Sequence, residues 1–135
     1  MRESGRTAAE GRILIVEDEF LVSEMIADMV AALGYSVSAR AVNLSDVRRA
    51  LAFANFDCVL LDVRLGNDLT VDAADVLIER GMPFAFVTGY TEAAEPRHAR
   101  VPILNKPFSI DQLRLLLERL IGPAPVRVAD RKQAG

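Results

Sequence analysis

Cysteine is scarce in this sequence, and no apolar stretch is long enough to cross a membrane. The single cysteine, Cys58, excludes an internal disulfide bond and multi-cysteine metal sites, and its place in an apolar segment predicts a buried, unreactive thiol. No apolar stretch approaches the ~18 residues of a membrane-spanning helix. We therefore expect a cytoplasmic protein that makes no contact with membranes.

Concentrated positive charge is absent as well. The net charge is −3 at pH 7 and no cluster of lysine and arginine stands out, so there is no electrostatic reason to bind nucleic acid. The length of 135 residues and the hydrophobic content of 51% predict one globular domain. We expect residues 1–11 to form a disordered lead, residues 12–121 the domain, and residues 122–135 a flexible tail.

Five apolar segments alternate with segments of helical periodicity along the chain. Between residues 22 and 33, apolar side chains recur three and four positions apart, which predicts an α-helix. Most of the predicted strands are continuous apolar runs, which indicates burial on both faces of a sheet. Right-handed crossovers between five β-α units then give a parallel α/β sheet, with ligands at the carboxyl ends of its strands.

Local signals mark several helix ends and one weak helix. Asn43 can cap the second helix, and the Ser109–Gln112 pattern is typical of a capping box before the last one. The fourth helical segment, residues 91–100, is weakly periodic and interrupted by Pro96, so we expect it to be short or mobile. His98 has no cysteine or carboxylate at a metal-ligand spacing and is predicted to be exposed in this loop.

Four of the predicted strands end in polar residues at or just past the last apolar position. In chain order these residues are Glu17 and Asp18, Asp62, Thr88 and Lys106. If the strands are parallel neighbours, three carboxylates, a hydroxyl and an ammonium meet at one edge of the sheet. That set suits a divalent cation, for which Mg²⁺ fits, together with a phosphoryl group on Asp62.

Each of these residues also has an ordinary structural interpretation. Glu17-Asp18-Glu19 can favour a helix N-terminus through the helix dipole, and Lys106 can be a surface lysine. Against this, adjacent acids repel one another unless a cation lies between them, and Asp62 can act as a nucleophile that forms an acyl phosphate. Lys106 and Thr88 can donate to phosphate oxygens, and Pro107 permits a cis peptide bond that would fix the direction of the lysine.

As a set, these residues resemble the receiver domain of two-component response regulators. The resemblance rests on the spacing of Glu17-Asp18, Asp62, Thr88 and Lys106-Pro107-Phe108, and it covers residues 12–121. It implies a flavodoxin-like fold with strand order 2-1-3-4-5. It also implies a magnesium site at Glu17, Asp18, Asp62 and the carbonyl oxygen of Arg64. The phosphoryl group would reach Asp62 from a sensor histidine kinase or a histidine phosphotransfer protein.

Several positions depart from the usual receiver pattern. Leu65-Gly66 stands where most receivers have Met-Pro, and Ile103 occupies the place of the switch aromatic. Tyr90 lies two residues after Thr88, and the segment that contains them resembles the atypical receiver branch nicknamed FAT GUY. Members of that branch tend to be stand-alone proteins with a loosened fourth helix, and they are often linked to kinases of the HWE type. On this resemblance we hypothesise that Tyr90 and residues 89–100 become ordered on phosphorylation.

Two positions bear on the lifetime of the acyl phosphate. In receivers, the residues two past the aspartate and two past the threonine guide or block the attacking water. Here these residues are Arg64 and Tyr90. Both side chains are bulky enough to cover the site, so we predict slow self-hydrolysis.

Other functions share parts of this pattern. An aspartyl-phosphate phosphatase would use the same nucleophile but normally has a second aspartate where Arg64 stands, and a nucleotide-binding module would need a glycine-rich turn after the first strand. A receiver-like scaffold that is never phosphorylated is a further alternative. We expect no output domain after residue 121, and therefore signalling to an unknown partner by protein–protein contact, or action as a phosphate sink. Enzymatic activity is expected only as self-catalysed phosphoryl transfer and hydrolysis.

Overall fold

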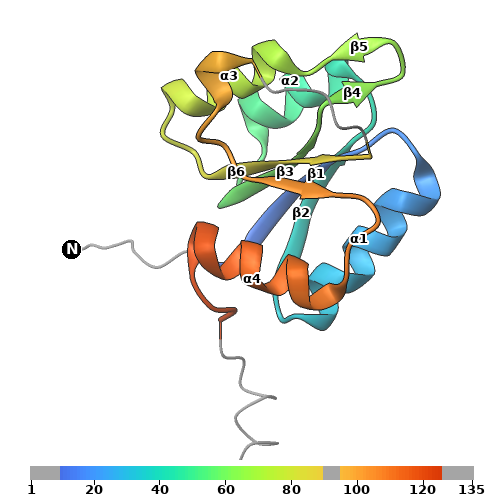
Figure 1. Ribbon diagram of the computed structural model, residues 1–135, viewed down its shortest axis with the longest axis vertical. Coiled ribbons are helices and arrows are strands. Elements are labelled where there is room, and N and C mark those ends of the chain that lie inside the picture. The colour runs from blue at the N-terminus through green and yellow to red at the C-terminus, as the bar shows by residue number, and fades with distance from the viewer. Residues whose placement is uncertain (1–9, 90–94, 126–135) are drawn as a thin grey trace, which may run out of the picture.

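The computed structural model describes residues 10–89 and 95–125, which form a sheet with helices on both faces (Figure 1). Five parallel strands lie in the order β2-β1-β3-β6-β7. They are β1 (Arg12–Val16), β2 (Ser36–Ala41), β3 (Cys58–Asp62), β6 (Phe84–Thr88) and β7 (Ile103–Asn105). The α-helices of the described ranges are α1 (Phe20–Ala32), α2 (Leu44–Phe53), α3 (Val71–Glu79) and α4 (Ile110–Ile121). Because β4 and β5 form a separate hairpin, β6 and β7 are the fourth and fifth strands of the main sheet. The α/β class and the predicted strand order 2-1-3-4-5 are therefore confirmed.

Side chains of the central strands alternate between two hydrophobic cores. Ile13 and Cys58 face the core that includes buried residues of α1 and α4, whereas Leu14 and Val59 face the core that includes buried residues of α2 and α3. The helices α1 and α4 cover one face of the sheet, and α2 and α3 cover the other (Figure 1). Every residue of β3 and β6 is buried, as continuous apolar strands predict for a sheet covered on both faces. Burial raises the pKa of Cys58 to about 12, in agreement with the predicted buried, unreactive thiol.

The helix ends follow the local sequence signals. The side chain of Asn43 accepts a hydrogen bond from the Asp46 amide at 2.8 Å at the start of α2. Ser109 and Gln112 form a reciprocal capping box at the start of α4. Both predicted caps are confirmed, and caps of this kind stabilise a helix by about 1 kcal/mol.

Two segments differ from a simple β-α repeat. Residues 64–69 contain an antiparallel hairpin of β4 (Arg64–Leu65) and β5 (Asp68–Leu69). The fourth of five helices was expected at residues 91–100. The described part of this segment, residues 95–100, holds only the 3-10 helix η1 (Pro96–His98), so the helix described there is short, as expected. Tyr90 lies in the range 90–94, outside the described residues.

The predicted exposure of His98 is wrong. The side chain is 1% exposed, and its Nε2 lies 2.8 Å from Asp75 Oδ1 on α3. The imidazole ring also packs against Phe86 of β6, with ring centroids 5.8 Å apart. Hydrogen bonds from Arg97 and His98 lower the pKa of Asp75 to about 2. The segment after residue 94 is therefore held against α3 and the sheet.

Contacts of the chain continue past the predicted boundary at residue 121. Tyr35 is buried, and its hydroxyl donates to the carbonyl oxygen of Gly122 at 2.8 Å. Ala124 packs against the core on the α1 and α4 face. A Cβ atom added to Gly11 would lie 2.9 Å from Cδ of Pro125, so these two residues are in close contact. Within the described ranges, no helix is both long and apolar enough to span a bilayer.

Candidate functional site

The residues selected from the sequence gather at the carboxyl ends of the parallel strands. Glu17 and Asp18 directly follow β1, Asp62 and Thr88 end β3 and β6, and Lys106 directly follows β7. The strand order places β3 between β1 and β6, with β7 at the edge. Segments as far as 89 residues apart in the chain therefore meet at one place.

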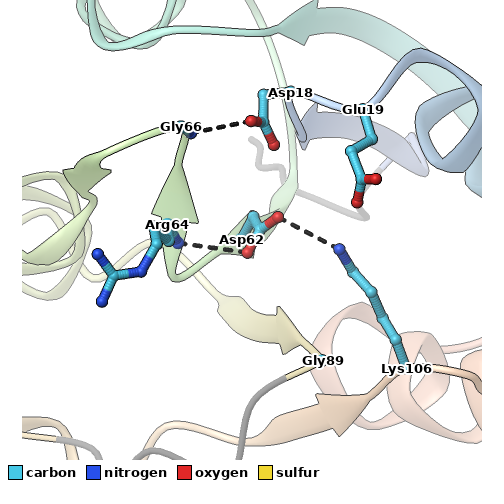
Figure 2. A pocket seen from close by; sticks show the side chains of 7 residues that line it. All are labelled: Asp18, Glu19, Asp62, Arg64, Gly66, Gly89 and Lys106. Atoms are coloured by element: carbon cyan, nitrogen blue, oxygen red, sulfur yellow. Dashed lines mark hydrogen bonds and ion pairs between the residues drawn. The ribbon is translucent and has the colours of Figure 1, made fainter.

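Lys106 links two of the carboxylates. Its Nζ donates to Glu17 Oε1 at 2.6 Å and to Asp62 Oδ2 at 3.2 Å; Figure 2 shows the second contact. Glu17 is 1% exposed and Asp62 is 5% exposed. Burying a carboxylate without a partner is costly, so the ammonium group compensates for the negative charge that the strand ends bring together.

Burial and the ion pair shift the pKa values of Glu17 and Lys106 in opposite directions. Burial raises the pKa of Glu17 more than the hydrogen bonds from Lys106 and from the Glu19 amide lower it. Burial by itself would lower the pKa of Lys106, but the hydrogen bond to Glu17 and the charge of Asp62 outweigh it, so the pKa is raised. The lysine is therefore cationic at neutral pH, and Glu17 ionises less readily than an exposed glutamate.

The β4–β5 hairpin contacts the carboxylates through its backbone amides. Gly66 N donates to Asp18 Oδ2 at 2.8 Å, and Arg64 N donates to Asp62 Oδ1 at 3.3 Å (Figure 2). Gly66 has a φ of +60°, which glycine adopts without steric cost. Leu65-Gly66, a departure from the usual receiver pattern, thus forms part of the hairpin that contacts Asp18. The sequence alone carried no signal for this contact.

The carboxylates have the donor chemistry and the spacing for a hard cation. Glu17, Asp18 and Asp62 each offer one oxygen, and these oxygens lie within 4.8 Å of one another. Ligands of octahedral Mg²⁺ at about 2.1 Å lie roughly 3 to 4.2 Å apart, so small shifts suffice. Both oxygens of Glu17 already accept hydrogen bonds, whereas Asp18 is exposed. Both oxygens of Asp62 also accept hydrogen bonds, and Asp62 is 5% exposed, so Asp18 is the most accessible of the three carboxylates.

A cleft of about 530 Å³ lies beside Asp62. Its lining in the described part of the chain consists of Asp18, Glu19, Asp62, Arg64, Gly66, Gly89 and Lys106. Figure 2 shows the Arg64 side chain extending away from Asp62, so here it does not cover the carboxylate. Thr88 is 4% exposed, and its carbonyl oxygen accepts a hydrogen bond from Lys106 N at 2.9 Å.

The other residues predicted to act in switching lie near the edge strand. Ile103 is 45% exposed on β7, opposite Phe86 in the strand pairing. The Lys106–Pro107 peptide bond is cis, an isomer that the proline at position 107 permits. The predicted role of Tyr90 concerns a residue outside the described ranges.

Comparison with known proteins defines the class of this protein. The sequence model of the response regulator receiver domain family matches residues 13–118. The chain therefore belongs to the response regulator receiver domain family.

Solved receiver structures share the fold over nearly their whole length. SdrG from Sphingomonas melonis Fr1 is 30% identical, with a TM-score of 0.75 over 84% of this chain and 98% of SdrG. The receiver domain of the sensor histidine kinase PA1611 from Pseudomonas aeruginosa PAO1 is 29% identical, with a TM-score of 0.70 over 84% of this chain and 99% of that domain. The PA1611 structure holds a magnesium ion coordinated in the active site cleft.

The curated relatives are longer proteins. The transcriptional regulatory protein CrdR of Helicobacter pylori is 27% identical over 126 residues, which are 87% of this chain and 58% of CrdR. This chain spans about half the length of the curated relatives that it matches. The similarity therefore concerns only part of each of these proteins.

Proposed function

We propose that this chain is a phosphoacceptor of a two-component system and that Asp62 is the acceptor. The observation that carries the proposal is the position of Asp62 in the cleft, where Lys106 Nζ contacts one carboxylate oxygen and Arg64 N contacts the other. A carboxylate oxygen attacks the phosphorus of a phosphohistidine, and the phosphorus–nitrogen bond breaks. The products are an acyl phosphate on Asp62 and a histidine whose ring nitrogen takes up a proton.

Magnesium is the cofactor in this proposal. Asp18, Asp62, Glu17 and the carbonyl oxygen of Arg64 would hold the ion, which supplies positive charge to the incoming phosphoryl group. The spacing of the three carboxylate oxygens supports this assignment, as does the magnesium ion of the PA1611 receiver domain. Lys106 would add a second positive charge, and Thr88 would donate a hydrogen bond to a phosphoryl oxygen.

The phosphodonor in this proposal is a sensor histidine kinase, such as one of the HWE type, or a histidine phosphotransfer protein. The similarity to SdrG, whose structure was also solved in a BeF3-activated conformation, supports activation by a phosphoryl-like group at such a site. Ile103 stands where most receivers have the switch aromatic. This departure supports membership of the chain in the atypical FAT GUY branch, with switching through Tyr90. The output would be contact with a further protein, or removal of phosphoryl groups from a shared kinase.

Phosphorylation of the intact chain tests this function. The protein is incubated with acetyl phosphate in Mg²⁺ or in EDTA, and its intact mass is measured. We expect an adduct of one phosphoryl group in Mg²⁺ only, which fragmentation places on the segment that ends at Asp62. If no adduct forms in Mg²⁺, the chain is a scaffold that is not phosphorylated, and the proposal fails.

Replacement of Arg64 by alanine is expected to shorten the lifetime of the acyl phosphate. The Arg64 side chain lines the cleft but extends away from Asp62 (Figure 2). A phosphoryl group carries negative charge that would attract the guanidinium group toward it and cover the acyl phosphate. A partly exposed ion pair of up to about 1 kcal/mol corresponds to a roughly fivefold shorter half-life in Arg64→Ala. The half-life is measured from the loss of the phosphoryl adduct, followed by intact mass after acetyl phosphate is removed. Equal half-lives for the wild type and Arg64→Ala would exclude a protective role of Arg64.

A further inference from the structure

Thr70 contacts the backbone of the residue that carries the candidate nucleophile. Its hydroxyl donates to the carbonyl oxygen of Asp62 at 2.6 Å and also contacts the carbonyl oxygen of Val63 at 3.2 Å. Its backbone N–H donates to the same Val63 oxygen at 3.0 Å. Thr70 is 1% exposed, so water does not compete for these hydrogen bonds.

The Thr70 hydroxyl binds the backbone at the end of β3 and does not cap α3, the helix that begins after Thr70. Thr70 occupies the N-cap position of α3, where a threonine side chain commonly accepts a hydrogen bond from the first turn of the helix. No such cap hydrogen bond is formed. The side chain instead points back to the end of β3, eight residues earlier in the chain.

These bonds close the β4–β5 hairpin at its base. The hairpin begins directly after Val63 and ends at Leu69, next to Thr70. Its amides donate to two of the candidate metal ligands, from Gly66 to Asp18 and from Arg64 to Asp62. The Thr70 hydroxyl therefore joins the backbone that carries the nucleophile to the segment that orients the carboxylates.

We propose that Thr70 is a positioning residue for phosphoryl transfer, a role that rests on the proposed function of Asp62. By fixing the Asp62 carbonyl group and the base of the hairpin, the hydroxyl sets the direction of the Asp62 carboxylate and the distance from Asp62 to the amides of Arg64 and Gly66. Groups that orient metal ligands and nucleophiles in this way typically change metal affinity or activity by about 10- to 100-fold when they are removed.

Three variants separate positioning from general stabilisation. Thr70→Val keeps the shape of the side chain and removes the hydroxyl, while Thr70→Ser keeps the hydroxyl. Tyr35→Phe is the matched control, because it also removes a buried hydroxyl that donates to a backbone carbonyl, that of Gly122, at the other end of the sheet. Thermal unfolding of each variant establishes that it is folded at the assay temperature.

The first measurement is the rate of adduct formation in Mg²⁺ as a function of acetyl phosphate concentration. We expect the maximal rate of Thr70→Val to fall by about 10-fold or more, with the half-saturating concentration within about twofold of wild type, since the hydroxyl orients the nucleophile and does not bind the donor. Thr70→Ser and Tyr35→Phe are expected to keep the wild-type rate. A rate for Thr70→Val equal to that of Tyr35→Phe would overturn the proposal.

The second measurement does not depend on phosphorylation. Amide hydrogen exchange at Arg64 and Gly66 is expected to quicken in Thr70→Val and to stay at the wild-type level in Thr70→Ser and Tyr35→Phe. Unchanged exchange in Thr70→Val would show that the hydroxyl does not hold the hairpin. If the wild type itself gains no phosphoryl group, the function of Asp62 fails, and the exchange rates still decide whether Thr70 positions the hairpin.

Discussion

The variant Asp62→Asn is expected to gain no phosphoryl group from acetyl phosphate and Mg²⁺, under conditions in which the wild type gains one. An amide is neutral and is a far weaker nucleophile than a carboxylate, so the acyl phosphate cannot form at this position. The amide oxygen can still accept hydrogen bonds from Lys106 Nζ or Arg64 N, which hold the carboxylate in the wild type. The fold should therefore be retained, and intact mass together with circular dichroism reports both properties.

Asp68→Asn is the matched control for that variant. Asp68 is an exposed carboxylate on β5 of the hairpin beside the cleft, so its replacement removes the same charge close by without touching the nucleophile. We expect it to be phosphorylated like the wild type. A phosphoryl adduct on Asp62→Asn would show that another residue is the acceptor, and loss of the adduct in Asp68→Asn would show that the assay responds to local charge.

The second large effect is expected for Lys106→Met, which should lower the free energy of unfolding by about 3 kcal/mol at pH 8. The lysine Nζ is bonded to Glu17 and to Asp62, which are 1% and 5% exposed. Methionine has similar length but no charge, so two buried carboxylates lose their shared partner and repel one another. Urea denaturation of the wild type and the variant measures the difference.

This loss of stability is expected to depend on pH in one direction. The folded-state pKa of Glu17 is already raised from its ordinary value of 4.5, chiefly by burial, and Lys106 counteracts that rise. Removal of the lysine raises this pKa further. A carboxyl group whose pKa is higher in the folded state binds its proton more tightly there, so its protonation favours folding. The deficit of Lys106→Met is therefore smallest near pH 4.5 and grows as the pH rises through the folded-state pKa of Glu17.

A double variant identifies the cause of the deficit. Glu17→Gln combined with Lys106→Met removes one of the two unpaired charges, so we expect it to recover most of the stability that Lys106→Met loses at pH 8. Two outcomes would contradict this account. One is a deficit of Lys106→Met that is the same at pH 5 and pH 8, and the other is a double variant less stable than Lys106→Met.

Much of the fold and the grouping of the site residues could be predicted because both depend on strand burial. A strand such as β3, buried along its whole length, requires a continuous apolar run, and such runs are visible in a single sequence. Parallel strands bring their carboxyl ends to one edge of the sheet whatever the loops do. The polar residues after these runs, Asp62 and Lys106 among them, were therefore placed together without knowledge of any side-chain contact.

The features that escaped prediction depend on contacts that no periodic pattern records. The strands β4 and β5 have two residues each, too few for an alternating pattern to show. His98 and Asp75 are 23 residues apart, and His98 lies in a weakly periodic segment, so the burial of its ring could not be inferred. The bond from Thr70 to Asp62 was hidden for a different reason, since a threonine before a helix is normally interpreted as a cap.

The contact between Gly11 and Pro125 has a practical consequence for rearranging the chain. It brings the two ends of the described fold together beside the start of β1, at the end of the sheet opposite to the cleft. Adjacent ends can be joined by a short linker and the chain reopened at an exposed turn, as in a circular permutation. The linker of such a permutant would lie far from Asp62, and the spatial order of the strands around the nucleophile would be unchanged.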